Sequence, residues 1–265
     1  RDRDPVYIDR KLLDLSSETE SASKPRVQSI ENQQEVERAS VFVGRRAELE
    51  RASSVLKRGQ PVWVFGPRKI GKTQFLQELQ RLQSPLDEVL SISLWELEPT
   101  VLQNALEFDH ELAAKLTSRL KPSTQRALAR QGSAQPGPAP ERHQTKHLLQ
   151  SLLRLSLRTV ILFIDDLDLL EGYSTADWLL PLLRSTMECS YEGGKSRLAM
   201  VFASAQSPVA LQYRPAGSPF NIAVQISLSD LSEPSIWELS NKYKYSLLRE
   251  EIPEIRHWIG GHPFL

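Results

Sequence analysis

Short apolar runs alternate along the chain with longer stretches in which apolar residues recur every three or four positions. The short runs predict buried strands, and they lie at Val62–Phe65, Val89–Leu94, Thr159–Ile164, Leu198–Ala203 and Ala223–Ile226. The longer stretches predict amphipathic helices at about 47–57, 74–82, 99–130, 147–157, 177–189 and over roughly the last 35 residues. Strands that alternate with helices indicate an α/β fold in which a parallel sheet is covered on both faces.

Two polar segments interrupt this pattern. Residues 1–39 are polar, with a run of Ser and Glu, which predicts a linker or extended arm before an ordered domain that starts at about residue 40. Residues 131–140 hold Gly and Pro at a density that no strand or helix tolerates, so we expect a flexible surface insertion there. The chain begins at Arg1 and stops at Leu265 within a predicted helix, which suggests a fragment of a longer protein.

The composition is that of an ordinary globular protein, with 40% hydrophobic and 25% charged residues. A formal net charge of +0 provides no global field that would favour nucleic acid or an anionic membrane. The one cysteine, Cys189, excludes an internal disulfide and favours a reducing compartment. Because no apolar run could span a bilayer and no signal peptide opens the sequence, we expect a cytoplasmic protein without a membrane partner.

Basic residues gather on both sides of the insertion. A solvated helix face is the simpler explanation for them, and a contact surface for a partner or a nucleic acid is the alternative. The residues concerned are Lys115, Arg119, Lys121, Arg126, Arg130, Arg142 and Lys146.

A phosphate-binding loop of the form GxxxxGK[ST] follows the first predicted strand. It occupies residues 66–73, between an apolar strand and a segment with helical spacing, which is the context that such a loop requires. Its glycines let backbone N–H groups point at a β-phosphate, Lys72 reaches the β- and γ-phosphates, and the Thr73 hydroxyl binds Mg²⁺. The predicted nucleotide-binding residues are Gly66, Pro67, Arg68, Lys69, Ile70, Gly71, Lys72, Thr73 and Gln74.

A second candidate element is the apolar strand that ends in Asp165 and Asp166. The C-terminal end of a central strand would deliver these carboxylates beside the phosphate loop. Asp165 would hold Mg²⁺ directly or through a water, and Asp166 would act as the general base for the attacking water. Asp168 is better explained as a helix cap. At the end of the fourth strand, Ser204 is either a sensor of the γ-phosphate or an ordinary turn residue.

Together these segments resemble the STAND class of AAA+-like P-loop ATPases, in the branch related to Orc/Cdc6. Phe42–Leu49 is similar to the segment that opens this module, in which Val41 and Phe42 would cover the adenine. Gly260–Leu265 is similar to the GGHPFL motif of its lid, where His262 and Pro263 would contact the nucleotide. The resemblance implies a P-loop three-layer sandwich at 40–228 with a five-stranded parallel sheet in the order 5-1-4-3-2. Residues 229–265 would form the start of a small helical lid.

The resemblance also implies a function. The expected protein is a switch that holds ADP at rest and ATP when active, with Lys72 and Asp166 supporting slow, Mg²⁺-dependent hydrolysis. Its expected partners are effector and sensor domains of the same polypeptide, and a homo-oligomer is expected on activation. The sequence departs from the family pattern in two ways: we identify no Arg finger, and the insertion at 131–140 is unexplained.

Two other functions compete with this switch. One is a scaffold that binds nucleotide without hydrolysing it, which turnover measurements would distinguish. The other is a DNA-loading ATPase of the Orc/Cdc6 type, which the zero net charge does not favour. A GTPase is not expected, because no Asn/Thr-Lys-x-Asp motif for reading guanine occurs in the chain.

Overall fold

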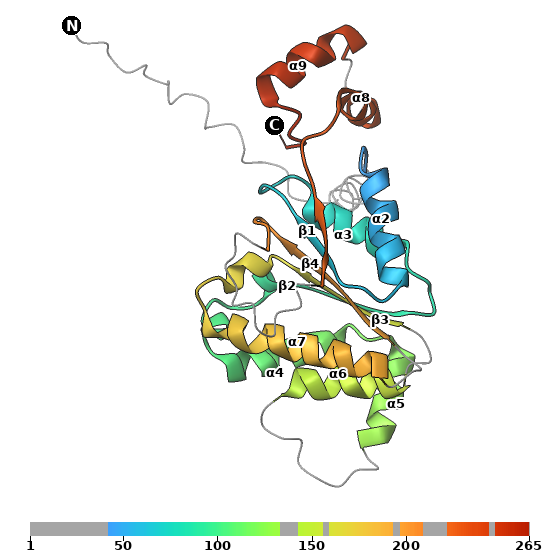
Figure 1. The fold of residues 1–265 in the computed structure, drawn as a ribbon, viewed down its shortest axis with the longest axis vertical. Helices are drawn as coiled ribbons and strands as arrows, with labels where there is room; N and C mark the ends of the chain where they lie inside the picture. The colour runs from blue at the N-terminus through green and yellow to red at the C-terminus, as the bar shows by residue number, and fades with distance from the viewer. Residues whose placement is uncertain are drawn as a thin grey trace, which may run out of the picture. The chain divides into compact units, whose positions relative to one another are not determined.

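Five parallel strands form the central sheet of the protein. The computed structural model describes residues 42–132, 143–155, 159–192, 197–208, 222–243 and 247–264. The strands lie side by side in the order β2-β3-β4-β1-β5, which confirms the predicted order 5-1-4-3-2 (Figure 1). Their bounds are β1 Val62–Phe65, β2 Glu88–Ser93, β3 Thr159–Asp165, β4 Arg197–Ser204 and β5 Val224–Ser227.

The burial of each strand follows its place in the sheet. Central strands β3 and β4 are buried along all but their first residue, as expected for strands covered on both faces. Strand β2 lies at the edge and alternates between buried and half-buried residues. The position of a strand in the sheet therefore explains its sequence pattern: β3 and β4 are covered on both faces and have continuous apolar runs, whereas the edge strand β2 alternates.

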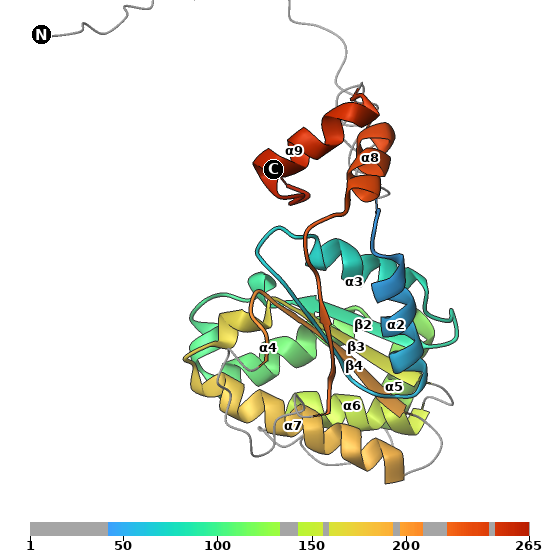
Figure 2. The same cartoon turned by 45° about the horizontal axis from the view of Figure 1, so that its top comes forward.

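Helices cover both faces of the sheet, which makes a three-layer sandwich. Figure 2 shows α2 and α3 on one side of the strands, and α6 and α7 on the other. Successive residues of β3 face opposite layers: Leu162 packs with α4, α6 and α7, whereas Phe163 packs with α2 and α3. The helix bounds are α2 Arg46–Lys57, α3 Lys72–Arg81, α4 Ala105–Ser118, α5 Pro122–Gly132, α6 Gln144–Leu155 and α7 Ser174–Glu192.

The helical region predicted at 99–130 is two helices rather than one. The Asn104 side chain accepts hydrogen bonds from the backbone N–H groups of Leu106 and Glu107 and so starts α4 anew. Helix α4 ends at Ser118, and Pro122 occupies the first position of α5, where a missing N–H costs nothing. Short 3-10 turns, η1 (Leu94–Glu96) and η2 (Val101–Gln103), lead from β2 into α4.

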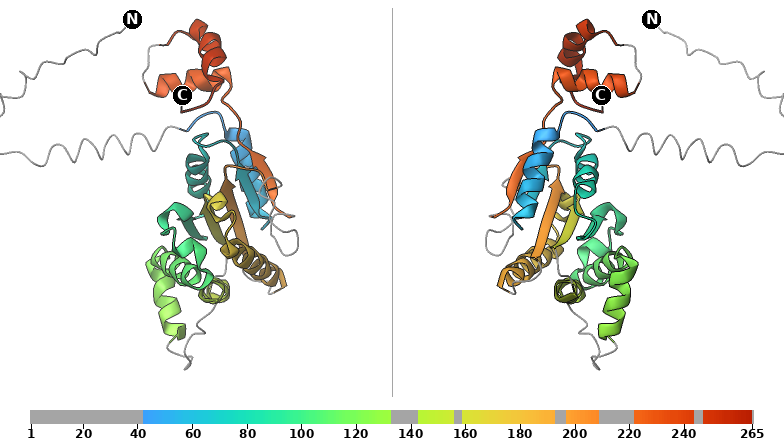
Figure 3. Two further views of the ribbon diagram at one scale, coloured as in Figure 1. Left: turned by 90° about the vertical axis from the view of Figure 1, so that its left-hand side faces the viewer. Right: turned by 90° about the vertical axis from the view of Figure 1, so that its right-hand side faces the viewer.

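A small group of helices follows β5 at the place where the sequence predicts a lid, and we use that name for it. It contains α8 (Glu233–Lys242), the 3-10 turn η5 (Arg249–Glu251) and α9 (Ile252–Ile259). Figure 3 shows these helices beyond the end of the sheet. No helix among the described residues is both long and apolar enough to cross a membrane.

The lid core includes a residue from the start of the described region. Val43 is buried with Leu231, Ile236 and Ile252 in one hydrophobic cluster. Its neighbour Gly44 has φ +67°, and a Cβ atom there would lie 2.3 Å from the hydroxyl oxygen of Ser235. The segment that leads into α2 is therefore part of the lid packing, and Gly44 is required by this close approach.

Replacement of Gly44 by Ala should destabilise the protein more than the same replacement at a left-handed glycine whose surroundings are open. Gly172 is the matched control, because its φ is +81° and a Cβ atom there would meet nothing within 4 Å. We expect Gly172→Ala to lower the free energy of unfolding by about 1–2 kcal/mol. Gly44→Ala should lower it by about 1–3 kcal/mol more, because Ser235 must also shift. Urea unfolding checks this, and equal losses for the two variants would contradict it.

Candidate functional site

The phosphate loop leaves β1 at Gly66 and enters α3 at Lys72. A Cβ atom on Gly66 would lie 2.5 Å from the carbonyl oxygen of Leu228, so only glycine fits there. Gly71 has φ +97° at the N-cap of α3, where no side chain caps the helix and no acid lies in the first turn. The positive potential of this helix end is therefore not neutralised by its own residues, which makes it suited to an anion.

The Lys72 ammonium lies inside the loop. The residue is 8% exposed, and its Nζ donates hydrogen bonds to the backbone carbonyls of Gly66 at 2.9 Å and Pro67 at 3.0 Å. Burial lowers the pKa of Lys72, whereas the charges of Asp168 and Asp165 act to raise it. The loop thus holds a cation at its centre, close to carboxylates.

Thr73 joins the phosphate loop to the end of β3. Its Oγ1 donates a hydrogen bond to Asp165 Oδ2 at 2.6 Å, across 92 positions of sequence. A hydroxyl and a buried carboxylate are oxygen ligands of the type that Mg²⁺ binds. No group of three or more His, Cys, Asp or Glu side chains suited to a metal occurs in the described part of the chain. A Mg²⁺ ion at Thr73 and Asp165 would therefore take its other ligands from phosphate and water.

Asp166 follows in a left-handed conformation, with φ +58°. Its backbone N–H donates to Asp165 Oδ1 at 2.9 Å, and its Oδ2 accepts from the Ser93 hydroxyl at 2.8 Å. Burial and the neighbouring Asp165 charge raise the pKa of Asp166, while the Ser93 hydrogen bond acts to lower it. Asp168 does not cap η3 (Leu167–Leu170); its Oδ1 accepts from the backbone N–H of Ala205 at 2.9 Å instead.

Lys72, Thr73, Asp166 and Asp168 border one cavity of about 500 Å³ between the sheet end and the lid, whereas Asp165 is not among its lining residues. The core contributes the phosphate loop, the acids after β3 and the exposed Trp95, and the lid contributes residues of α8 and of the segment after α9. The lining residues are Arg68, Lys69, Gly71, Lys72, Thr73, Gln74, Trp95, Asp166, Asp168, Leu169, Ala205, Leu239, Tyr243, Pro263 and Phe264. Ile70 of the loop is buried in the hydrophobic core, so its side chain supports the loop from behind.

Ser204 does not border this cavity. It is fully buried at the end of β4, where it accepts a hydrogen bond from the Trp63 indole N–H at 2.8 Å and donates to the carbonyl of Gln206. Its hydroxyl therefore serves internal packing, and the predicted role as a γ-phosphate sensor has no support in this geometry. The next residue, Ala205, lines the cavity in its place.

Phe42, one of the two residues predicted to cover the adenine, is not among the residues that line the cavity. Val41 lies outside the described residues, and Phe42 packs against Phe75 of α3, with ring centroids 6.3 Å apart. The apolar lining includes Leu239 and Tyr243, which are four residues apart in sequence at the end of α8. This spacing is a signal that the sequence already contained, because residues four apart share a helix face.

The segment after α9 touches the phosphate loop. His262 Nε2 lies 3.1 Å from the carbonyl oxygen of Arg68, and the Lys69 ammonium lies 3.7 Å from the centre of the Phe264 ring. Pro263 lines the cavity between these two contacts. The structure therefore brings His262 and Pro263 to the loop, and their contact with a nucleotide remains a prediction.

Comparison with known proteins supports a P-loop fold. A family model described as an AAA-like domain matches residues 31–265. The Walker-type ATPase of Pyrococcus abyssi has a TM-score of 0.54 and 15% identity, over 84% of this chain and 65% of that chain. Cdc6p from Pyrobaculum aerophilum has a TM-score of 0.52 and 16% identity, over 77% of this chain and 50% of that chain.

A third similar structure is the ORC2 protein of Aeropyrum pernix in ADPNP and ADP complexes, with a TM-score of 0.52 and 12% identity. The match covers 80% of this chain and 54% of that chain. The chain thus spans between half and about two-thirds of the length of these structures, and the likeness concerns the fold. None of the curated proteins matches the chain in sequence.

Lys72→Ala should weaken nucleotide binding. The substitution removes the cation that the loop holds at its centre, so we expect the affinity for ATP to fall at least about tenfold, or 1.4 kcal/mol. Arg81→Ala at the other end of α3 is the control, since that side chain is exposed and pairs with Glu78. Calorimetry with Mg-ATP checks this; an unchanged affinity of Lys72→Ala would place the nucleotide elsewhere.

Proposed function

The chain belongs to the AAA-like domain family, and we propose that it is a nucleotide-controlled switch that binds Mg-ATP and hydrolyses it slowly. The observation that carries this proposal is the hydrogen bond between Thr73 and Asp165. It places the phosphate loop and the acidic end of β3 at one site, which is the arrangement that Mg-dependent phosphoryl transfer requires. The ADPNP and ADP complexes of the Aeropyrum pernix ORC2 structure support nucleotide binding by this fold.

Each part of the site has a distinct task in this proposal. The backbone N–H groups of the loop and the N-terminus of α3 bind the phosphates, and Lys72 offsets their charge. Thr73 and Asp165 would hold Mg²⁺, which neutralises charge on the phosphates when it is bound. Asp166 lines the cavity, with one carboxylate oxygen bonded to Ser93, so its other oxygen is the one to accept a proton from the attacking water.

The lid makes this site a switch. His262 and Phe264 contact the phosphate loop at Arg68 and Lys69, so the position of the lid depends on the loop. Gly260 and Gly261 precede them with φ of +68° and +87°, which gives the segment backbone freedom to change its contacts. We propose that exchange of ADP for ATP alters these contacts and signals to other domains of the same polypeptide, with assembly into a homo-oligomer in the ATP form.

A scaffold that binds nucleotide without turnover is the main alternative. Both proposals require the same loop, so hydrolysis distinguishes them. A DNA-loading ATPase is less favoured, because three of the basic residues between 115 and 146 are used within the fold. Lys115 pairs with Glu111, Arg119 pairs with Glu96, and Lys121 donates to backbone carbonyls of the segment before β2.

Asp166→Asn should separate binding from turnover. The amide keeps the shape of the side chain but cannot accept the proton, so Mg-ATP should still bind while the rate of phosphate release falls about 100-fold or more. Glu171→Gln, an exposed carboxylate in the same region of sequence, is the control. Measured release of phosphate at the wild-type rate from Asp166→Asn would exclude this residue as the base.

His262→Ala should loosen the hold on ADP. The imidazole bonds to the phosphate loop in this structure and would also lie near bound phosphate, so its loss should speed ADP dissociation about tenfold. His257→Ala on the exposed surface of α9 serves as the comparison. Stopped-flow release of a fluorescent ADP analogue provides the rates, and equal rates in the wild type and His262→Ala would refute a role for His262 in retention.

A further inference from the structure

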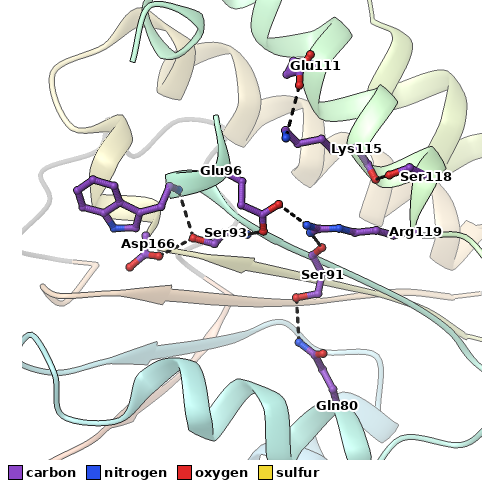
Figure 4. Close-up of polar contacts among 10 residues, drawn as sticks. Gln80, Ser91, Ser93, Glu96, Glu111, Lys115, Ser118, Arg119 and Asp166 are labelled. Carbon is purple, nitrogen blue, oxygen red and sulfur yellow. Dashed lines mark hydrogen bonds and ion pairs between the residues drawn. The ribbon is translucent and has the colours of Figure 1, made fainter. Parts of the chain in front are cut away.

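A continuous series of polar contacts runs from the end of α4 to Asp166, and Figure 4 shows it. It begins at Arg119, one of the basic residues that the sequence left as either a solvated face or a contact surface. The side chain of Arg119 bonds to the backbone carbonyl of Ser91 and to the carboxylate of Glu96. One planar guanidinium therefore holds two points at the end of strand β2, as its rigid fork of donors allows.

Glu96 in turn fixes the conformation of Ser93. Its Oε1 accepts from the backbone N–H of Ser93 at 3.2 Å, while the Ser93 hydroxyl oxygen accepts from the backbone N–H of Trp95 at 3.2 Å. This reciprocal arrangement is a capping box around η1. With an N–H donor on its oxygen, the Ser93 hydroxyl has its proton free to donate in another direction.

That proton is donated to Asp166. Ser93 Oγ lies 2.8 Å from Asp166 Oδ2. The backbone of Asp166 has the left-handed φ of +58°, a conformation that Asp adopts more readily than most other residues. The strand that carries Ser93 is held from the opposite layer as well, since Gln80 of α3 donates to the Ser91 hydroxyl at 3.0 Å (Figure 4). The orientation of Asp166 thus depends on a fixed end of β2.

We propose that Arg119 is a positioning residue for Asp166, acting through Glu96 and Ser93. This inference rests on the proposed ATPase function and adds to it a residue directly after α4 that lines neither the cavity nor the proposed metal site. Loss of Arg119 frees Glu96 and the β2 carbonyl together, so the Ser93 hydroxyl loses its fixed direction and Asp166 its orientation. Lys72 and Thr73 lie outside this series, and Asp165 is bonded to the backbone N–H of Asp166 rather than to its carboxylate. We therefore expect nucleotide affinity to be retained.

The test compares Arg119→Met with Lys115→Met. Both residues lie in or directly after α4, four positions apart, and both form an ion pair, but Lys115 pairs with Glu111 of its own helix at 3.6 Å (Figure 4). We expect Arg119→Met to lower kcat about three- to tenfold with the Kd of Mg-ATP unchanged within about twofold, since only transition-state positioning is lost. Lys115→Met should leave both quantities at wild-type values.

A double-mutant cycle tests the route. Glu96→Gln should reproduce the loss of kcat, and the double variant Arg119→Met/Glu96→Gln should be no worse than either single variant, because both break one series of contacts. Additive losses would show that Arg119 acts by another route and would overturn the proposal. A rise in kcat in Arg119→Met would also overturn it, since the series would then restrain Asp166 rather than position it.

Amide hydrogen exchange tests the role of Arg119 without a measurement of ATP hydrolysis. We expect faster exchange at residues 93–96 and 165–168 in Arg119→Met than in Lys115→Met, because the contacts that hold these segments are removed only in the first variant. Equal exchange in the two variants would overturn the proposal even if the wild type hydrolysed no ATP. In that event the absence of turnover would count against the proposed function, and the exchange result alone would decide on Arg119.

Discussion

The site depends on one hydrogen bond, that between Thr73 and Asp165, and the sheet makes this bond possible. Strands β1 and β3 are not neighbours; both pair in parallel with β4, which lies between them. All strands therefore end at the same edge, and whatever follows β1 and β3 meets there. The phosphate loop leads from this edge into α3 and brings the Thr73 hydroxyl to 2.6 Å from the carboxylate of Asp165. Without the parallel order, the two halves of the site would lie at opposite edges.

The same edge also ties the lid to the loop. Leu228 donates from its backbone N–H to Phe65, and its carbonyl is so near Gly66 that no side chain fits between them. Three residues later, the backbone N–H of Leu231 donates to the carbonyl of Gly261 at the far end of the lid. The linker between β5 and α8 thus contacts the first residue of the phosphate loop and the glycine that precedes His262. A change in loop conformation has a short physical route to the lid.

Local patterns in the sequence predicted the strands and the loop, because central strands bury continuous apolar runs and the loop has fixed spacing. The order of the strands was implied by the resemblance to the STAND class. Local patterns could not predict that the Ser204 side chain is buried, because its position depends on a hydrogen bond from the indole N–H of Trp63 in a neighbouring strand. They also did not predict that Phe42 packs against Phe75, because an aromatic ring can pack equally well against the hydrophobic core or against the face of an adenine ring. Arg119 and Ser93 were beyond reach for a different reason. Their contacts join separate elements, and no periodicity or spacing marks such pairs.

Electrostatics set a requirement on any nucleotide that enters the cavity. Asp165, Asp166 and Asp168 all act to raise the pKa of Lys72, and Arg68, which also lines the cavity, acts to lower it. A polyphosphate would add several negative charges beside these acids, in a partly buried place where charges interact more strongly than in water. The helix N-terminus contributes only a partial positive charge. A divalent cation between Asp165 and the phosphates would offset this repulsion, which supports the proposal that nucleotide binds here together with Mg²⁺.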